Sequence, residues 1–281
     1  MLLEHALDRY LVQLAANGRS KHTIDQARRH MLLFVRWLQA EGLSGDLDDL
    51  DHEDVALFLA SEWVRKRADG ALRKASSANA LRSSLRAFFR YVFEAGSAPR
   101  NAARLVRRGR IGPRRPRALS ESEEARLRTA LRQAKTTTEL RDRAMFTLML
   151  DTGLRVGSVV ALRVEDLCRE SGELRIATMK GGREMVVRLD MSGIALLVAV
   201  IGERWRGWVF ESRSGDHITT RHVQRRLQMW MSRAAIRARL PPHALRHTFG
   251  VRQYGRGVDL LQIRAALGHQ SLNTTACYVT T

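Results

Sequence analysis

The sequence has little cysteine, no long hydrophobic run and too few acidic residues to balance its basic ones. Cys168 and Cys277 are the only cysteines among 281 residues. They lie far apart in the chain, which excludes a disulfide framework and a metal knuckle built on cysteine pairs. The longest apolar stretches, such as 194–201, are much shorter than the roughly 20 residues that span a bilayer. The N-terminus also lacks the pattern of a secretion signal, so we expect a cytoplasmic protein.

The sequence has 29 acidic residues against 48 lysines and arginines, which gives a formal net charge of +19. Such an excess indicates a polyanionic partner, and nucleic acid is the first candidate. Two alternatives remain at this point. One is a merely solvated, arginine-rich surface, and the other is a surface that binds an acidic membrane. The membrane alternative is weaker because no basic amphipathic helix with large apolar residues on its other face stands out.

The first hundred residues have the apolar spacing of helices throughout. Leu7, Leu11 and Leu14 recur at helical intervals, and a second stripe over 24–38 follows Ser20, a candidate N-cap. Two more helices are predicted from about Asp51 and over 81–92. Because each has one apolar face, we expect these four helices to form a small bundle over residues 1–108.

A basic segment separates this bundle from the rest of the chain. Residues 100–117 hold eight arginines and no acidic residue, together with Pro113 and Pro116. A helix cannot continue through those prolines, so 109–118 is predicted to be an extended linker. Its charge suits contact with phosphates, although an unspecialised solvated linker would have the same composition.

A second domain is predicted over 119–281. It opens with the capping-box pattern Ser120-Glu121-Ser122-Glu123. Alternating apolar residues on either side of Lys180-Gly181-Gly182 predict a hairpin. The remainder has helical spacing, in segments at 140–150, 156–162, 192–203, 219–239, 243–254, 259–267 and 271–279.

Five short strings in this domain occur in a distinctive order: Thr152-Gly153-Leu154-Arg155, Lys180-Gly181-Gly182, His243-Ala244-Leu245-Arg246-His247, Leu267-Gly268-His269 and Tyr278. Each string alone is weak evidence. Their order and spacing, including the nine-residue step from His269 to Tyr278, resemble the tyrosine recombinase (phage integrase) family and its Xer-like members. The resemblance covers about 119–279, while the helical N-terminal part and basic linker fit the family more loosely.

The chemistry implied by this resemblance explains the two arginines. Attack of a phenol oxygen on a DNA phosphodiester places extra negative charge on the nonbridging phosphate oxygens. Guanidinium groups stay ionised and present paired donors to such oxygens. Arg155 and Arg246 are therefore the expected phosphate clamp.

The resemblance assigns roles to the other site residues. Tyr278 is the expected nucleophile, which forms a 3'-phosphotyrosine and releases a 5'-hydroxyl. Lys180 matches the lysine that protonates the leaving oxygen, His243 the general acid/base, and His269 the histidine that hydrogen-bonds the phosphate. The bond energy is kept in the phosphotyrosine, so neither ATP nor another cofactor is expected. Accordingly, the sequence has no glycine-rich phosphate-binding loop before Lys-Ser/Thr.

The resemblance also implies an architecture and partners. We expect a mainly α protein with a small β-sheet in the catalytic domain, arranged as a two-domain, C-shaped DNA clamp. Double-stranded DNA is the expected partner, bound by a homotetramer on two sites or by a heterotetramer with a related recombinase, in the nucleoid. A type IB-like topoisomerase and a catalytically silent DNA-binding regulator are the alternative functions.

A metal site is a further alternative because His243 and His247 have the four-residue spacing of helical ligands. The zinc-protease pattern requires glutamate after the first histidine, where this chain has Ala244. No third ligand and no distinctive set of clustered carboxylates is apparent. We therefore expect no metal, and a structural role for His247.

Two features depart from the family pattern. Many relatives have Ser-Glu after the first arginine motif, whereas this chain has Gly157-Ser158. The missing acid implies weaker activity, a substitute elsewhere or a divergent subgroup. The sequence also ends at Thr281, where Xer-like relatives usually continue into a helix that docks on a neighbouring protomer. Either assembly uses another surface, or cooperation within the tetramer is altered.

Overall fold

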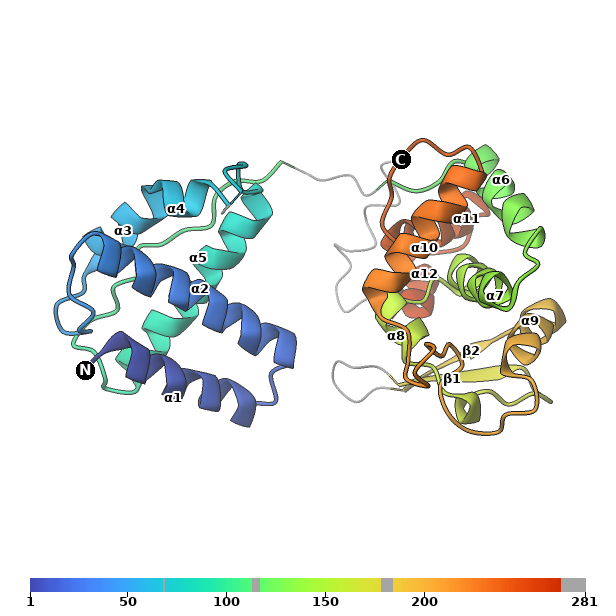
Figure 1. Cartoon of the computed structure of the whole chain (residues 1–281), viewed down its shortest axis with the longest axis horizontal. Coiled ribbons are helices and arrows are strands. Elements are labelled where there is room, and N and C mark those ends of the chain that lie inside the picture. Colours follow the sequence, from blue (N-terminus) through green and yellow to red (C-terminus); the bar gives the residue numbers. More distant parts are fainter. Residues whose placement is uncertain (68, 113–116, 178–183, 269–281) are drawn as a thin grey trace. The chain divides into compact units, whose positions relative to one another are not determined.

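The computed structural model describes residues 1–67, 69–112, 117–177 and 184–268. The chain divides into two compact units, Met1–Arg114 and Arg115–Thr281 (Figure 1). Each unit has its own hydrophobic core. The described parts are mainly helical with one small sheet in the second unit, which confirms that part of the predicted fold class. None of the described helices is long and apolar enough to cross a membrane.

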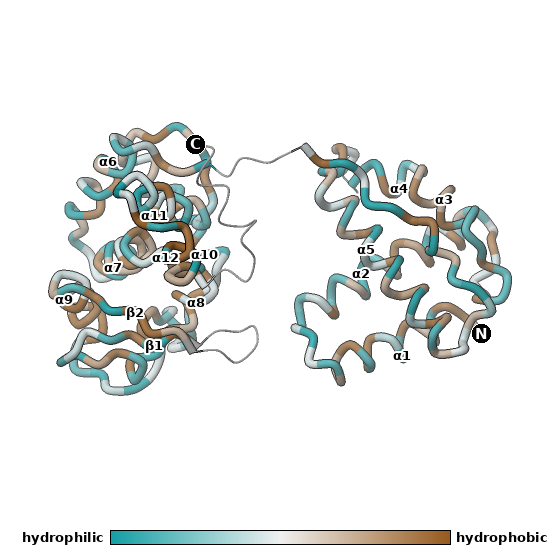
Figure 2. The backbone as a smooth tube through the Cα atoms, turned by 180° about the vertical axis from the view of Figure 1, so that it is seen from behind, coloured by the Kyte–Doolittle hydropathy of each residue, from teal (hydrophilic) through white to brown (hydrophobic). Residues whose placement is uncertain are grey.

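The first unit consists of helices. They are α1 (Leu3–Ala16), α2 (Lys21–Ala40), α3 (His52–Ala60), α4 (Glu62–Arg65) and α5 (Ala75–Glu94). Ser20 caps α2 as predicted, its hydroxyl accepting from the Thr23 amide. The four predicted helices are present, and the short α4 is an addition. Hydrophobic residues recur along α2 and α5 with hydrophilic residues between them (Figure 2).

Aromatic side chains fill the core of the first unit. Phe34 lies 4.9 Å from Phe58 and 5.8 Å from Phe89, measured between ring centroids. These contacts join α2, α3 and α5, and edge-to-face or tilted rings at such distances add to the stabilisation from burial. The aromatic stripes of the sequence are thus structural in this unit.

The start of the basic linker is fastened to this bundle. Asn79 of α5 is 3% exposed. Its amide nitrogen donates to the Gly109 carbonyl, and its amide oxygen accepts from the Gly109 N–H, both at 2.8 Å. A side-chain amide therefore pairs with the backbone as a neighbouring strand would.

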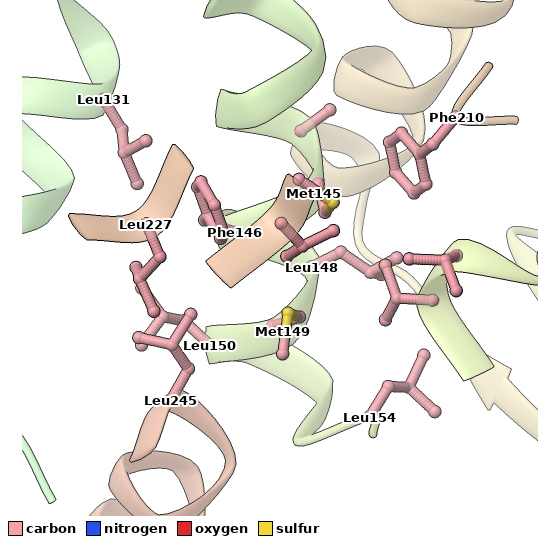
Figure 3. Packing of buried hydrophobic residues seen from close by; sticks show 14 of the residues in the cluster. Leu131, Met145, Phe146, Leu148, Met149, Leu150, Leu154, Phe210, Leu227 and Leu245 are labelled. Atoms are coloured by element: carbon pink, nitrogen blue, oxygen red, sulfur yellow. The ribbon is translucent and has the colours of Figure 1, made fainter. Parts of the chain in front are cut away.

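The second unit surrounds one buried helix. Its elements are α6 (Glu121–Arg132), α7 (Thr137–Thr152), α8 (Val156–Val160), the 3-10 turn η1 (Val164–Asp166), β1 (Glu173–Ala177), β2 (Glu184–Arg188), α9 (Met191–Ile201), α10 (Thr220–Arg233), α11 (His243–Gly255) and α12 (Leu260–Leu267). The capping box at Ser120 and Glu123 is present. Other helices cover the middle of α7; Met145, Phe146 and Met149 are fully buried among their neighbours (Figure 3), whereas Leu140 and Asp151 are exposed.

The sheet is the predicted hairpin. Strands β1 and β2 are antiparallel, with Leu174 opposite Val187 and Ile176 opposite Met185. Leu174 and Ile176 are buried while Arg175 between them is exposed, as the alternating pattern requires. The predicted turn at Lys180-Gly181-Gly182 lies outside the described residues.

The helix predicted over 219–239 ends early, which corrects that boundary. Helix α10 ends at Arg233, and Ala235 has a left-handed φ of 54°. The Ile236 amide donates to the Met231 carbonyl and the Ala235 amide to the Ser232 carbonyl, the pair of bonds that terminates many helices. Ile236 thereby becomes buried. The predicted helix over 271–279 lies outside the described residues.

Candidate active site

Helix α7 ends at a glycine that no other residue can replace without strain. Gly153 has φ of 66° and caps the helix. A Cβ atom at this position would lie 2.6 Å from both Phe249 and Leu267. Glycine therefore allows α11 and α12 to approach the end of α7, and it reverses the chain just before Arg155.

Arg246 is buried where these three helices meet. It lies at the end of the first turn of α11 and is 1% exposed. Its Nη1 donates to the Gly153 carbonyl at 2.8 Å, and its Nη2 donates to the Leu267 carbonyl at 2.5 Å. One guanidinium thus joins the carboxyl ends of α7 and α12, where helix dipoles favour positive charge.

Arg155 lies against the same end of α12 but is exposed. It is the N-cap residue of α8, and its Nη2 donates to the Gly268 carbonyl at 3.4 Å. The two arginines therefore bond to consecutive carbonyls, those of Leu267 and Gly268. Among the residues that the structure describes, no carboxylate forms an ion pair with Arg155, which leaves its charge available to an anion.

His243 begins α11 on the same side as these arginines. Partial burial, with the positive charges of Arg246 and Arg155, lowers its pKa below the ordinary value of 6.5. Burial, with His243 and Arg246, lowers the pKa of His247 to about 4. The two rings meet edge to face, with centroids 4.6 Å apart. His243 is therefore neutral at pH 7 and can accept a proton, while the His247 ring packs against it.

These side chains form an electropositive site suited to a phosphate. The structure brings together three of the six predicted site residues: Arg155, His243 and Arg246. Two guanidinium groups can bind phosphate oxygens, and a neutral imidazole beside them can accept a proton. Lys180, His269 and Tyr278 lie outside the described residues, so their predicted roles stay predictions.

In the described ranges, no group of three or more His, Cys, Asp and Glu side chains is placed to hold a metal ion. His243 and His247 have each other as neighbours, and their lowered pKa values follow from burial and nearby positive charge. The contact between the two rings and their lowered pKa values are thus explained by packing and charge.

Sequence reasoning missed two residues that hold the site in place. Thr248, buried on α11, accepts from the Leu119 amide at 2.9 Å. Arg252, also on α11, donates to the Leu150 carbonyl of α7 at 2.6 Å. Their partners lie more than a hundred residues away in sequence, so no local pattern signals either contact.

Comparison with known families accounts for nearly all of the chain. Residues 117–281 match the phage integrase family, and residues 7–96 match the phage integrase N-terminal SAM-like domain. Tyrosine recombinase XerD of Ralstonia nicotianae is 31% identical over 93% of this chain and 84% of its own length. Tyrosine recombinase XerC of Pelobacter propionicus is 32% identical over 92% of this chain and 84% of its own length.

Solved structures show the same fold. A lambda integrase dimer bound to a COC' core site superposes with a TM-score of 0.73 and 21% identity, covering 98% of this chain and 97% of that one. The XerH recombinase bound to a palindromic difH substrate superposes with a TM-score of 0.75 and 19% identity, covering 98% of this chain and 80% of that one. Together with the XerC and XerD relatives, these findings show that the chain belongs to the phage integrase family and is a Xer-like, site-specific tyrosine recombinase.

Proposed function

We propose that this recombinase cuts and rejoins double-stranded DNA through a covalent bond between Tyr278 and a 3'-phosphate. The observation that carries the proposal is the convergence of exposed Arg155, buried Arg246 and neutral His243 at the ends of α7, α11 and α12. These groups have the charge and proton affinity that transfer of a phosphoryl group to a phenol requires.

In the proposed cleavage step, the Tyr278 oxygen attacks the phosphorus atom and its proton passes to His243. The bond from phosphorus to the 5'-oxygen breaks, and Lys180 gives that oxygen a proton. Arg155, Arg246 and His269 bind the nonbridging oxygens while their negative charge increases. Rejoining is the reverse reaction with a 5'-hydroxyl of the partner strand, so the step consumes no ATP.

We assign residues 1–108 to DNA binding, 109–118 to a basic linker and 119–281 to catalysis. Assembly as a homotetramer on two DNA sites, or as a heterotetramer with a related recombinase, is supported by a lambda integrase tetramer solved on a Holliday junction. That structure covers 96% of this chain at 21% identity with a TM-score of 0.72. The XerC and XerD relatives favour recombination over the topoisomerase and silent-binder alternatives. Activity on nucleoid DNA in the cytoplasm follows from this proposal.

The test uses the full chain and a nicked suicide substrate that carries a site selected from a genomic-fragment pool. Wild type should form a detergent-resistant protein–DNA adduct. Tyr278→Phe removes only the nucleophilic oxygen, so it should bind the same DNA with similar affinity and form no adduct. An adduct that persists in Tyr278→Phe would refute the assignment of the nucleophile. Relaxation of supercoils without strand exchange between two sites would instead support a topoisomerase.

A further inference from the structure

Four charged side chains form a network behind the active site: Glu124, Arg128, Asp151 and Arg252. Arg252 of α11 donates through Nη1 to the Glu124 carboxylate of α6. Arg128 of α6 donates to Glu124 at 2.9 Å and to Asp151 of α7 at 2.6 Å. Glu124 is only 9% exposed. This four-residue network therefore links α6, α7 and α11 and balances its own charge.

Arg252 also completes the carboxyl end of α7. The last carbonyls of a helix have no partner within it. In α7 the Met149 carbonyl accepts from the Gly153 amide. The next carbonyl, that of Leu150, has no such backbone partner, because the Leu154 amide donates to the Thr152 hydroxyl. The Leu150 carbonyl accepts from Arg252 Nη2 at 2.6 Å instead. An arginine of α11 thus replaces the missing helical bond of α7.

Two guanidinium groups of α11 consequently hold the segment that leads to Arg155. Arg252 binds the Leu150 carbonyl and Arg246 binds the Gly153 carbonyl. Arg155 follows Gly153 by two residues, and His243 and Arg246 lie on α11 itself. The position of Arg155 relative to Arg246 and His243 is therefore fixed from two points on one helix.

We propose that Arg252, oriented by Glu124, is a positioning residue that sets Arg155 against the reacting phosphate. This inference rests on the proposed function, because Arg155 must be part of the phosphate clamp. Catalytic geometry is sensitive to displacements of about 1 Å, which can cost on the order of a hundredfold in rate. Loss of the Arg252 fork should therefore slow cleavage more than it weakens DNA binding.

The principal variant is Arg252→Lys. Lysine keeps the charge beside Glu124 but lacks the planar fork that reaches Glu124 and the Leu150 carbonyl together. Adduct formation on the suicide substrate should slow by about 10- to 100-fold, while the dissociation constant for DNA stays close to that of wild type. The thermal midpoint should fall by only a few degrees, because one charge-assisted hydrogen bond is lost. Glu124→Gln combined with Arg252→Gln removes the buried carboxylate and its partly buried partner together and should slow cleavage similarly.

Arg233→Lys is the matched control. Arg233 of α10, whose side chain is more exposed than that of Arg252, also bonds a carboxylate: it donates to Glu139 at 2.5 Å, near the amino end of α7 and far along the helix from Arg155. This variant should cleave at close to the wild-type rate. Equal slowing in Arg233→Lys and Arg252→Lys would overturn the proposal, because general loosening of α7 would then explain both.

A double-mutant cycle with Arg155→Lys separates positioning from a purely structural role. If Arg252 acts through Arg155, adding Arg252→Lys to Arg155→Lys should slow cleavage by less than about twofold, since coupled residues are not additive. Full additivity would overturn the inference. A wild type that forms no Tyr278-dependent adduct would refute the proposed function and this inference together. A wild type that cleaves, with Arg252→Lys at the same rate, would refute the inference alone.

Discussion

Arg155 and Arg246 bond to neighbouring carbonyls at the end of α12, yet one is exposed and the other is 1% exposed. Exposure decides what else each side chain does. Within the described part of the chain, the Arg155 guanidinium has one long bond, to the Gly268 carbonyl, whereas the Arg246 guanidinium has two short bonds that join helices. In the proposed mechanism, the guanidinium of Arg155 therefore serves catalysis alone, whereas that of Arg246 serves both catalysis and stability.

Lysine substitutions should separate these roles. Arg155→Lys is expected to slow adduct formation by about 10² to 10³-fold, the usual loss for one transition-state donor. It should change the free energy of unfolding by less than about 0.5 kcal/mol, because the site is exposed. Arg246→Lys should slow cleavage similarly and also destabilise the fold by about 1.5 to 3 kcal/mol through lost charge-assisted hydrogen bonds. Urea denaturation beside the adduct assay measures both, and equal stabilities would contradict the burial argument.

His30 makes a pH-dependent contribution to the first unit. Its Nδ1 lies 2.8 Å from the Ser84 hydroxyl between α2 and α5. Burial, with Arg29 and Arg73, lowers its pKa from 6.5 to about 4. The unfolded state therefore binds a proton at higher pH than the folded state does, so stability should fall as the pH drops from about 6.5 to about 4.

The measurement is the urea midpoint at several pH values across this range. His30→Asn keeps an acceptor near the Ser84 hydroxyl but cannot be protonated, so it should show a smaller fall than wild type. His247, whose pKa is also lowered to about 4, should contribute the same fall in stability to both proteins. Identical pH profiles would show that His30 does not titrate as described.

Among the elements, α7 joins the hydrophobic core of the second unit to the candidate active site. Its buried side chains meet helices on several sides, and its carboxyl end is bonded by Arg246 and Arg252 (Figure 3). Gly153 makes this end possible because its φ is positive and its Cα faces Phe249 and Leu267. Helix packing and site geometry therefore depend on one small residue.

Gly153→Ala should be more harmful than the same change at Gly42. Gly42 follows α2 with a similar φ of 67°, but no atom lies within 4 Å of its hypothetical Cβ. Gly42→Ala should cost about 1 to 2 kcal/mol from backbone strain alone. Gly153→Ala should cost about 1 to 3 kcal/mol more from overpacking and should also slow cleavage, because α11 is pushed away. Thermal unfolding and the adduct assay compare the two, and equal effects would show that the overlap is relieved without cost.

For the whole molecule, the charge of +19 governs encounter with DNA. Arginines that contact phosphates release counterions, so affinity falls as salt rises. The predicted linker begins at Gly109, where the Asn79 side chain holds the backbone. Arg107, Arg108 and Arg110 around this point are exposed and are therefore available to phosphates.

Replacing Arg107, Arg108 and Arg110 by glutamine should weaken binding to specific and nonspecific DNA alike, because phosphate contacts carry no sequence information. The slope of log affinity against log salt should become shallower by up to about 0.9 for each arginine that contacts a phosphate. Fluorescence anisotropy at several salt concentrations measures this slope. An unchanged slope would show that these arginines do not contact DNA phosphates.

Local sequence determined the features that depend on near neighbours. The caps at Ser20 and Ser120 and the alternation of Leu174 and Ile176 are set by residues within a few positions, so a pattern can show them. The motifs that contain Arg155, His243 and Arg246 were also visible, because the resemblance lies in their order and spacing. Lys180, His269 and Tyr278 remain predictions from that same order.

Tertiary structure decided what depends on residues far apart in the chain. The packing of α6, α7, α11 and α12 against one another buries Arg246 and leaves Arg155 exposed. The same packing brings Arg252 to the Leu150 carbonyl and to Glu124. The end of α10 at Arg233 was likewise set by the burial of Ile236 in the core and not by a glycine or proline. Helical periodicity reports only which face of a segment is apolar; the partners of that face, and the backbone carbonyls that an arginine can reach, are fixed when distant segments pack together.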